Sequence, residues 1–126
     1  MSLEVTIDQE LFEAILEHAR MSHPLEAILL LRGKRKTVKI AVTDLIIPPL
    51  ATGGRRYSSF PVNMLPLDFS IMGSVHSHPS GSLLPSVNDF NHFFGKVMMI
   101  VAYPYVGEEN AKAFNCSGGQ AILRVE

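Results

Sequence analysis

Residues 73–89 constrain the fold of this chain more than any other part of the sequence. The apolar and β-branched residues 69–75 predict a strand that runs directly into His76 and His78. Side chains alternate between the two faces of a strand, so both histidines point the same way, roughly 6–7 Å apart at the backbone. Pro79 cannot continue a central strand, and the Ser-Gly-Ser run after it favours a turn. We therefore expect the chain to leave the sheet directly after the second histidine.

A short helix is expected after this turn. Residues 87–94 are long enough for two helical turns, and Gly95 would occupy the left-handed position that ends such a helix. Ser86 and Asp89 are three residues apart and lie near one helix face, so a sharp loop would carry Asp89 back over the histidines. Two imidazoles and one carboxylate are the ligand set of a catalytic zinc that keeps one position for water.

Each part of this pattern also has a simpler interpretation. Two histidines on one strand face are more often packing or surface residues than metal ligands. Ser86 and Asp89 resemble a helix N-cap pair with an acid in the first turn. Capping explains neither histidine, however, and packing explains neither the serine nor the turn. The residues taken together favour a metal site.

At this point the sequence resembles a known family. The His-Ser-His run at residues 76–78, the seven intervening residues, Ser86, two more residues and Asp89 are similar to the motif of the JAMM (MPN+) metalloproteases. The resemblance covers nearly the whole chain and points to the short, stand-alone prokaryotic members. In that family a glutamate begins an apolar strand just after the first helix, and Glu26 occupies that place.

The resemblance implies a zinc metallohydrolase that holds one Zn²⁺ per chain on His76, His78 and Asp89. Such an enzyme cleaves isopeptide or peptide bonds at the C-terminus of a ubiquitin-like modifier. A zinc-activated water attacks the carbonyl, Glu26 is the general base and later the acid, and Ser86 stabilises the oxyanion. Without the resemblance, Glu26 is equally well explained as a solvated residue at a strand end.

Two alternative functions stay open. One is a related zinc hydrolase that releases an amino acid from the C-terminus of a sulfur-carrier protein. The other is a non-catalytic scaffold domain of the same fold, although the intact motif argues against it. Ser77 is expected on the opposite strand face from the histidines and is left out of the predicted site.

The resemblance also suggests how a substrate tail would be held. The family's first insertion, which grips the tail, corresponds here to residues 51–59, with Arg55, Arg56 and Tyr57 as candidate substrate-binding residues. An ordinary flexible loop explains this segment equally well. An exposed strand edge would bind such an extended tail by β-addition. The second insertion is reduced to residues 95–96, which argues against recognition of a particular linkage.

Length and composition limit the other possibilities. The 126 residues are expected to form a single domain, residues 1–126, and 47% hydrophobic with 18% charged residues indicates a folded, soluble chain. A formal net charge of −1 argues against nucleic-acid binding. No apolar run reaches the ~20 residues of a membrane span, and no signal peptide is evident, so a cytoplasmic location is expected. The sequence leaves a homodimer open.

The remaining segments predict an α/β domain with a mixed, largely antiparallel sheet, a long N-terminal helix against it and the motif helix at the site. The long helix is expected over residues 6–21, begun by a capping box of Thr6 and Gln9. A basic turn is expected at residues 33–36. Further strands are expected at residues 25–31, 37–43, 97–103, 110–116 and 120–125, and a helical turn at residues 61–65. The resemblance implies a cytidine-deaminase-like, three-layer arrangement.

Overall fold

The structure is a computed structural model that describes residues 2–48, 69–91, 93 and 95–126. The helical turn predicted at residues 61–65 and the gripping segment predicted at residues 51–59 lie outside these residues. In the part of the chain that is described, no helix is both long and apolar enough to cross a membrane. The elements in chain order are β1 (Glu4–Ile7), α1 (Gln9–Ser22), β2 (Ile28–Lys36), β3 (Lys39–Ile46), β4 (Ile71–His78), α2 (Val87–Asn91), β5 (Val97–Ala102), the 3-10 helix η2 (Glu108–Asn110), β6 (Ala111–Asn115) and β7 (Gln120–Val125).

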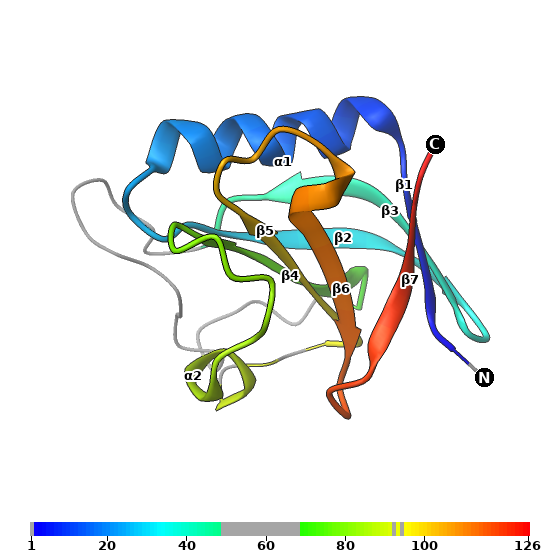
Figure 1. Cartoon of the computed structure of the whole chain (residues 1–126). Coiled ribbons are helices and arrows are strands. Elements are labelled where there is room, and N and C mark those ends of the chain that lie inside the picture. Colours follow the sequence, from blue (N-terminus) through cyan, green and yellow to red (C-terminus); the bar gives the residue numbers. More distant parts are fainter. Residues whose placement is uncertain (1, 49–68, 92, 94) are drawn as a thin grey trace.

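The described strands pair into a closed ring in the order β1-β3-β2-β4-β5-β6-β7, and β7 returns to β1 (Figure 1). The pairs β1–β3, β1–β7 and β4–β5 are parallel, and the other pairs are antiparallel. The predicted α/β class with a mixed sheet is confirmed. The closure was not predicted, and the three-layer arrangement stays an expectation of the resemblance. Every described strand is paired on both sides over at least part of its length, although β6 and β7 pair only through Ala113 and Phe114.

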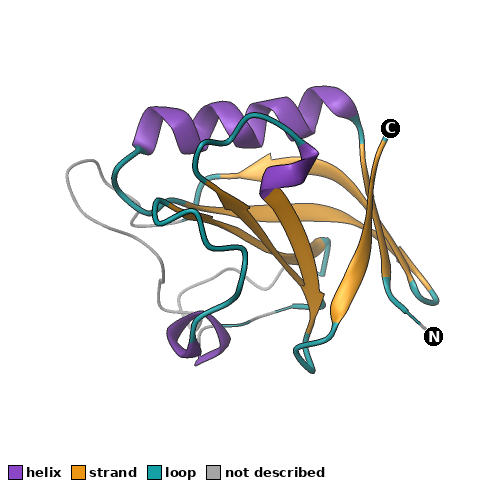
Figure 2. Ribbon diagram, in the orientation of Figure 1, coloured by secondary structure: helices purple, strands orange, loops and turns teal. Residues whose placement is uncertain are grey.

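The main core lies between α1 and the strands. Helix α1 runs along one side of the strand ring, and α2 lies away from it at the other side (Figure 2). Phe12 and Leu16 of α1 are buried against strand residues such as Leu31 and Met99. Burial of each side chain of this size contributes roughly 1.5–3 kcal/mol to the stability of the fold. This packing fixes β4 between β2 and β5 and so fixes the strand that carries the histidines.

The predicted start of the long helix is wrong. Thr6 lies in strand β1, where its hydroxyl donates to the Ile40 carbonyl at 3.5 Å, and α1 begins at Gln9. The cap is Asp8, whose carboxylate accepts from the Leu11 amide at 2.7 Å. Strand β1 pairs with β3 and β7, which are distant in sequence, and this pairing outweighs the local capping pattern around Thr6.

The basic turn predicted at residues 33–36 is also wrong. These residues belong to β2 and pair with β3, and the turn follows at residues 37–38, where Thr37 has φ of 56°. Gly33 serves close packing, because a Cβ atom there would lie 2.2 Å from the Ala41 carbonyl oxygen. The antiparallel pairing of β2 with β3 and the hairpin of β6 and β7 agree with the predictions. The helix predicted over residues 87–94 is shorter, because α2 ends at Asn91, so Gly95 is left-handed (φ 79°) but does not end the helix.

Candidate metal centre

Strand β4 presents both predicted histidines on one face. His76 is fully buried and His78 is 8% exposed, at the end of the strand just before the turn at Pro79. The strand is central, with β2 antiparallel on one side and β5 parallel on the other. Two fixed neighbours give the strand, and therefore its imidazoles, little freedom to move. The predicted strand and the shared face of the histidines are confirmed.

Helix α2 carries the predicted carboxylate to the histidines. The Ser86 hydroxyl accepts from the Asp89 amide at 3.0 Å, and Asp89 Oδ2 accepts from the Ser86 amide at 2.7 Å. These reciprocal bonds are those of a capping box, and they fix both the helix start and the carboxylate. Asp89 is 1% exposed, which is rare for an acid without a specific partner.

The Asp89 carboxylate contacts both imidazoles. Oδ2 lies 3.1 Å from His78 Nε2, and Oδ1 lies 3.5 Å from His76 Nδ1. The structure therefore brings together the three residues that the sequence predicted as ligands, from a strand and the following helix. The interaction is electrostatically strong because all three side chains are shielded from water.

Each imidazole has a second polar contact that orients its ring. The Ser74 hydroxyl lies 3.1 Å from His76 Nε2, and the Ser82 carbonyl lies 2.9 Å from His78 Nδ1. A carbonyl only accepts, so His78 keeps a proton on Nδ1, and Nε2 is left for a metal or, in the protonated ring, for Asp89. Second contacts of this kind fix the ring orientation and tautomer of metal-binding histidines.

The electrostatics of the pair follow from these contacts. Burial alone would lower the pKa of His78, but hydrogen bonds to Asp89 and the Ser82 carbonyl, with the charges of Asp89 and Glu26, raise it above 6.5. Burial alone would raise the pKa of Asp89, but hydrogen bonds from His78 and Ser86 and the nearby imidazoles lower it to about 2. Asp89 is therefore a carboxylate at neutral pH, which a metal ligand must be.

The chemistry of these donors fits zinc. Within residues 2–48, 69–91, 93 and 95–126, no group of three or more His, Cys, Asp or Glu side chains is arranged to hold a metal ion. Asp89 instead contacts His78 Nε2 directly. Neighbouring ligands of a tetrahedral zinc with bonds of about 2.0–2.1 Å lie about 3.3 Å apart. The contacts of 3.1 and 3.5 Å match that separation, and two imidazoles with one carboxylate are a zinc donor set.

Glu26 and Ser86 line a cavity together with His78. The cavity has a volume of about 430 Å³, and Pro24 and Leu84 contribute apolar walls. Glu26 precedes β2, is partly buried and lines this cavity, and its charge contributes to the raised pKa of His78. The structure thus places the predicted base and the predicted oxyanion donor at the same cavity as a predicted ligand.

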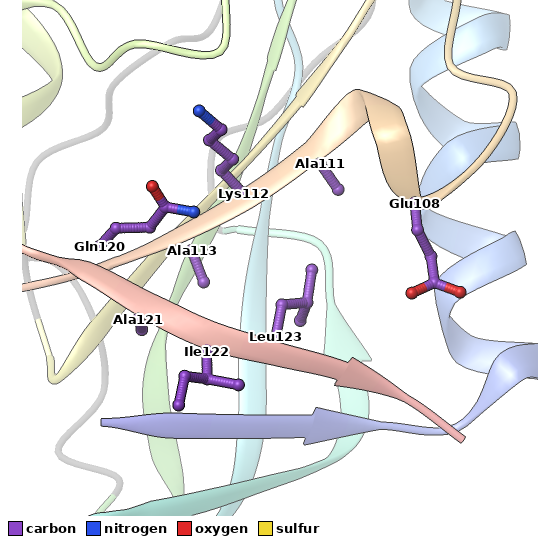
Figure 3. Close-up of a pocket in the computed structure, with 8 residues that line it drawn as sticks. All are labelled: Glu108, Ala111, Lys112, Ala113, Gln120, Ala121, Ile122 and Leu123. Atoms are coloured by element: carbon purple, nitrogen blue, oxygen red, sulfur yellow. The ribbon is translucent and has the colours of Figure 1, made fainter. Parts of the chain in front are cut away.

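A second cavity, of about 410 Å³, opens between β6 and β7 (Figure 3). Its walls are mainly alanine and aliphatic side chains, with Glu108, Lys112 and Gln120 as the polar residues. It contains none of the predicted site residues. The candidate site is therefore the cavity beside β4 and α2.

The remaining predicted residues have different outcomes. Arg55, Arg56 and Tyr57 lie outside the described residues, so their role in substrate binding stays a prediction. The orienting residues Ser74 and Ser82 were not predicted. Ser74 shares the strand face of His76, and that spacing could have identified it, whereas the Ser82 contact uses only its backbone carbonyl and leaves no sequence signal.

The fold and this site define the class of a metalloprotease-like domain. Residues 8–117 match the family described as prokaryotic homologs of the JAB domain, and the chain belongs to that family. A protein of Haloferax volcanii described as a probable metalloprotease is 35% identical over an alignment of 121 residues that covers 90% of this chain and 74% of that protein.

Solved structures agree with the family assignment. A JAB1/MPN domain protein from Archaeoglobus fulgidus is 36% identical, with 95% of this chain and 97% of that chain covered and a TM-score of 0.70. A structure described as JAMM, a metalloprotease-like zinc site in the proteasome and signalosome, is 30% identical and has a TM-score of 0.66. That alignment covers 100% of this chain and 99% of the other.

Proposed function

We propose that this protein is a zinc-dependent hydrolase that cleaves an isopeptide or peptide bond at the C-terminal tail of a ubiquitin-like modifier. The observation that carries the proposal is the contact of one buried carboxylate, Asp89, with His76 and His78 at the edge of a cavity lined by Glu26 and Ser86. Membership of the JAB family and the likeness to a probable metalloprotease support the same reaction class.

His76, His78 and Asp89 would hold the zinc, and Glu26 and Ser86 would act on the substrate. Bound zinc supplies a Lewis acid and a water that ionises near neutral pH. Glu26 takes the proton of the attacking water and returns it to the leaving amine, which general acid–base catalysis requires of one group in reach of both. The Ser82 carbonyl keeps His78 in a single orientation during these steps.

The Ser86 hydroxyl is suited to stabilise the developing oxyanion. Its oxygen already accepts a hydrogen bond from the Asp89 amide, which fixes its position. Its own proton remains to donate to a carbonyl oxygen in the cavity, as an oxyanion donor must. The same geometry makes Ser86 a poor nucleophile, because no described histidine contacts its oxygen to remove that proton.

Two related functions share this site. Release of an amino acid from a sulfur-carrier tail uses the same residues on a different substrate. A scaffold role without metal is disfavoured by the capping box that holds Asp89 against both histidines, since a scaffold does not require such an arrangement. Zinc analysis of the purified protein separates the scaffold from the enzymes. A cytoplasmic location and a homodimer are further parts of the proposal that solution work would test.

The experiment incubates the protein with linear fusions to candidate modifier and sulfur-carrier tails, with and without a zinc chelator. We expect cleavage that the chelator stops and that added zinc restores. Glu26→Gln should keep its zinc and lose about 10²–10⁴ in rate. Glu108→Gln, an exposed acid of η2 outside this cavity, serves as the matched control and should cleave normally. Cleavage by Glu26→Gln at the wild-type rate would refute the assignment of the base.

A further inference from the structure

Ser77 lies between the two histidines of β4 and points to the opposite side of the strand. Its side chain faces α1, where it meets Ile15, Ala19 and Ala27 around a small apolar space. The hydroxyl accepts from the Ala27 amide at 2.8 Å, and the Ser77 amide donates to the Ala27 carbonyl at 2.9 Å. Ser77 is therefore hydrogen-bonded to both the amide and the carbonyl of Ala27.

Ala27 is the residue directly after Glu26 and lies just before β2 begins at Ile28. The first β2–β4 pair is Ile28 with His76, so Ala27 is beyond the regular strand pairing. On the other side of Glu26, the Leu25 amide donates to the Ser22 carbonyl at 2.8 Å. The Glu26 backbone is thus held from α1 on one side and by Ser77 on the other.

We propose that Ser77 is a positioning residue that fixes the direction of the Glu26 side chain relative to His76 and His78. The inference rests on the proposed function for its catalytic consequence. Because Ser77 is on the same strand as both histidines, its two bonds to Ala27 join the base and the ligands into one rigid unit. A displacement of about 1 Å in a catalytic group can cost about 10²-fold in rate.

The surroundings of Ser77 determine which substitutions are informative. The space beside it holds only about 10 Å³ and is lined mainly by aliphatic side chains, with His18 as the other polar side chain, so a water that replaced a lost hydroxyl there would have few polar partners. Ser77→Ala therefore leaves the Ala27 amide without its acceptor. Ser77→Thr keeps the hydroxyl, and its extra methyl group meets the apolar space. Ser77→Cys keeps the size of the side chain with a weaker acceptor.

The test compares these variants by zinc content, by amide exchange at Ala27 and by steady-state kinetics on a cleaved tail fusion. For Ser77→Ala we expect full zinc content, about tenfold faster exchange of the Ala27 amide and a kcat lower by about 10- to 100-fold with KM unchanged. Ser77→Thr keeps the hydroxyl and should match the wild type in zinc content, in exchange of the Ala27 amide and in kcat. Ser77→Cys should be intermediate and replaces the alanine variant if that variant does not fold.

The control is Thr6→Val, which removes a hydroxyl from β1, a strand that pairs with β3 and β7. It should lower stability without changing kcat, as expected of a hydroxyl with a purely structural role. A wild-type kcat in Ser77→Ala and Ser77→Cys, or a Ser77→Thr variant as slow as Ser77→Ala, would overturn the inference. Unchanged exchange at Ala27 would also overturn it, even if the wild-type protein cleaved no tail. Absence of cleavage by the wild-type protein with zinc bound refutes the proposed function instead.

Discussion

Replacement of Asp89 by asparagine should weaken the fold of the zinc-free protein in a pH-dependent way. The folded-state pKa of Asp89 is about 2, below its ordinary value of 3.8. A lowered carboxyl pKa stabilises the fold above about pH 4, and the stabilisation is lost as the pH falls through about 2. The difference between these two pKa values corresponds to at most about 2.4 kcal/mol, and we expect a loss of about 1–2 kcal/mol in the free energy of unfolding.

The partner of Asp89 sets the upper limit of the pH window. The pKa of His78 is raised above 6.5, so the stabilisation from its protonated ring is complete below 6.5 and is lost as the pH rises through the folded-state value. The charged pair therefore contributes most between about pH 4 and pH 6.5. The difference between wild type and Asp89→Asn should be largest in that range and small near pH 2.

The assay is urea unfolding with a chelator present, followed by far-ultraviolet circular dichroism because the chain contains no tryptophan. If the free energy of unfolding falls by about 1.5 kcal/mol per molar urea, the urea midpoint of Asp89→Asn at pH 5.5 should be about 1 M below that of the wild type. Asp44→Asn is the control, since Asp44 forms an exposed ion pair with Arg32 at 3.6 Å and should change little. Equal midpoints for wild type and Asp89→Asn at pH 5.5 would refute the assigned interaction.

Two more predictions concern the support of the site. Ser86→Ala should lower kcat by less than the ~10²–10³ of a sole oxyanion donor, because zinc shares that role, and should destabilise α2 by about 1 kcal/mol through loss of the cap on Asp89. Rate assays and urea unfolding measure the two effects, and an unchanged midpoint would contradict the capping role. Gly73→Ala should unfold the protein or lower its free energy of unfolding by about 3 kcal/mol or more, at or above the upper end of the usual cost of overpacking. The reason is that its Cβ would lie 1.8 Å from the Val97 carbonyl oxygen. Gly107→Ala meets only the movable Glu109 carboxylate, so thermal unfolding of that variant should match wild type; similar losses in both would contradict the packing argument.

The arrangement of residues 76–89 could be predicted more closely than the strand pairing because it depends on local patterns. The alternation of His76 and His78 follows from strand geometry alone, and the spacing from Ser86 to Asp89 follows from a helix start. Both patterns are read over a few residues. The contact of Asp89 with both histidines also needed a loop of suitable length between Pro79 and Ser86, which the resemblance to a family supplied.

Long-range strand pairing accounts for the two elements that the sequence predicts wrongly. Strand β1 has only four residues and is stabilised by parallel pairs with β3 and β7, both of which lie far from β1 in the chain. No local pattern reports such pairs, so local spacing alone predicts a helix cap at Thr6. Residues 33–36 were assigned to a turn because they are basic and begin with glycine, although Gly33 is there to let β3 approach.

The two interpretations of Ser86 and Asp89, a helix cap and a metal site, are complementary in this structure. Asp89 Oδ2 accepts from the Ser86 amide at 2.7 Å and also lies 3.1 Å from His78 Nε2, while Oδ1 faces His76. The helix start therefore fixes the carboxylate whose other contacts are the two imidazoles. A variant that keeps the cap but not the carboxylate charge, such as Asp89→Asn, separates the two roles, because α2 can persist while the ligand set is lost. The short helix is best understood as the support that delivers this carboxylate to the strand.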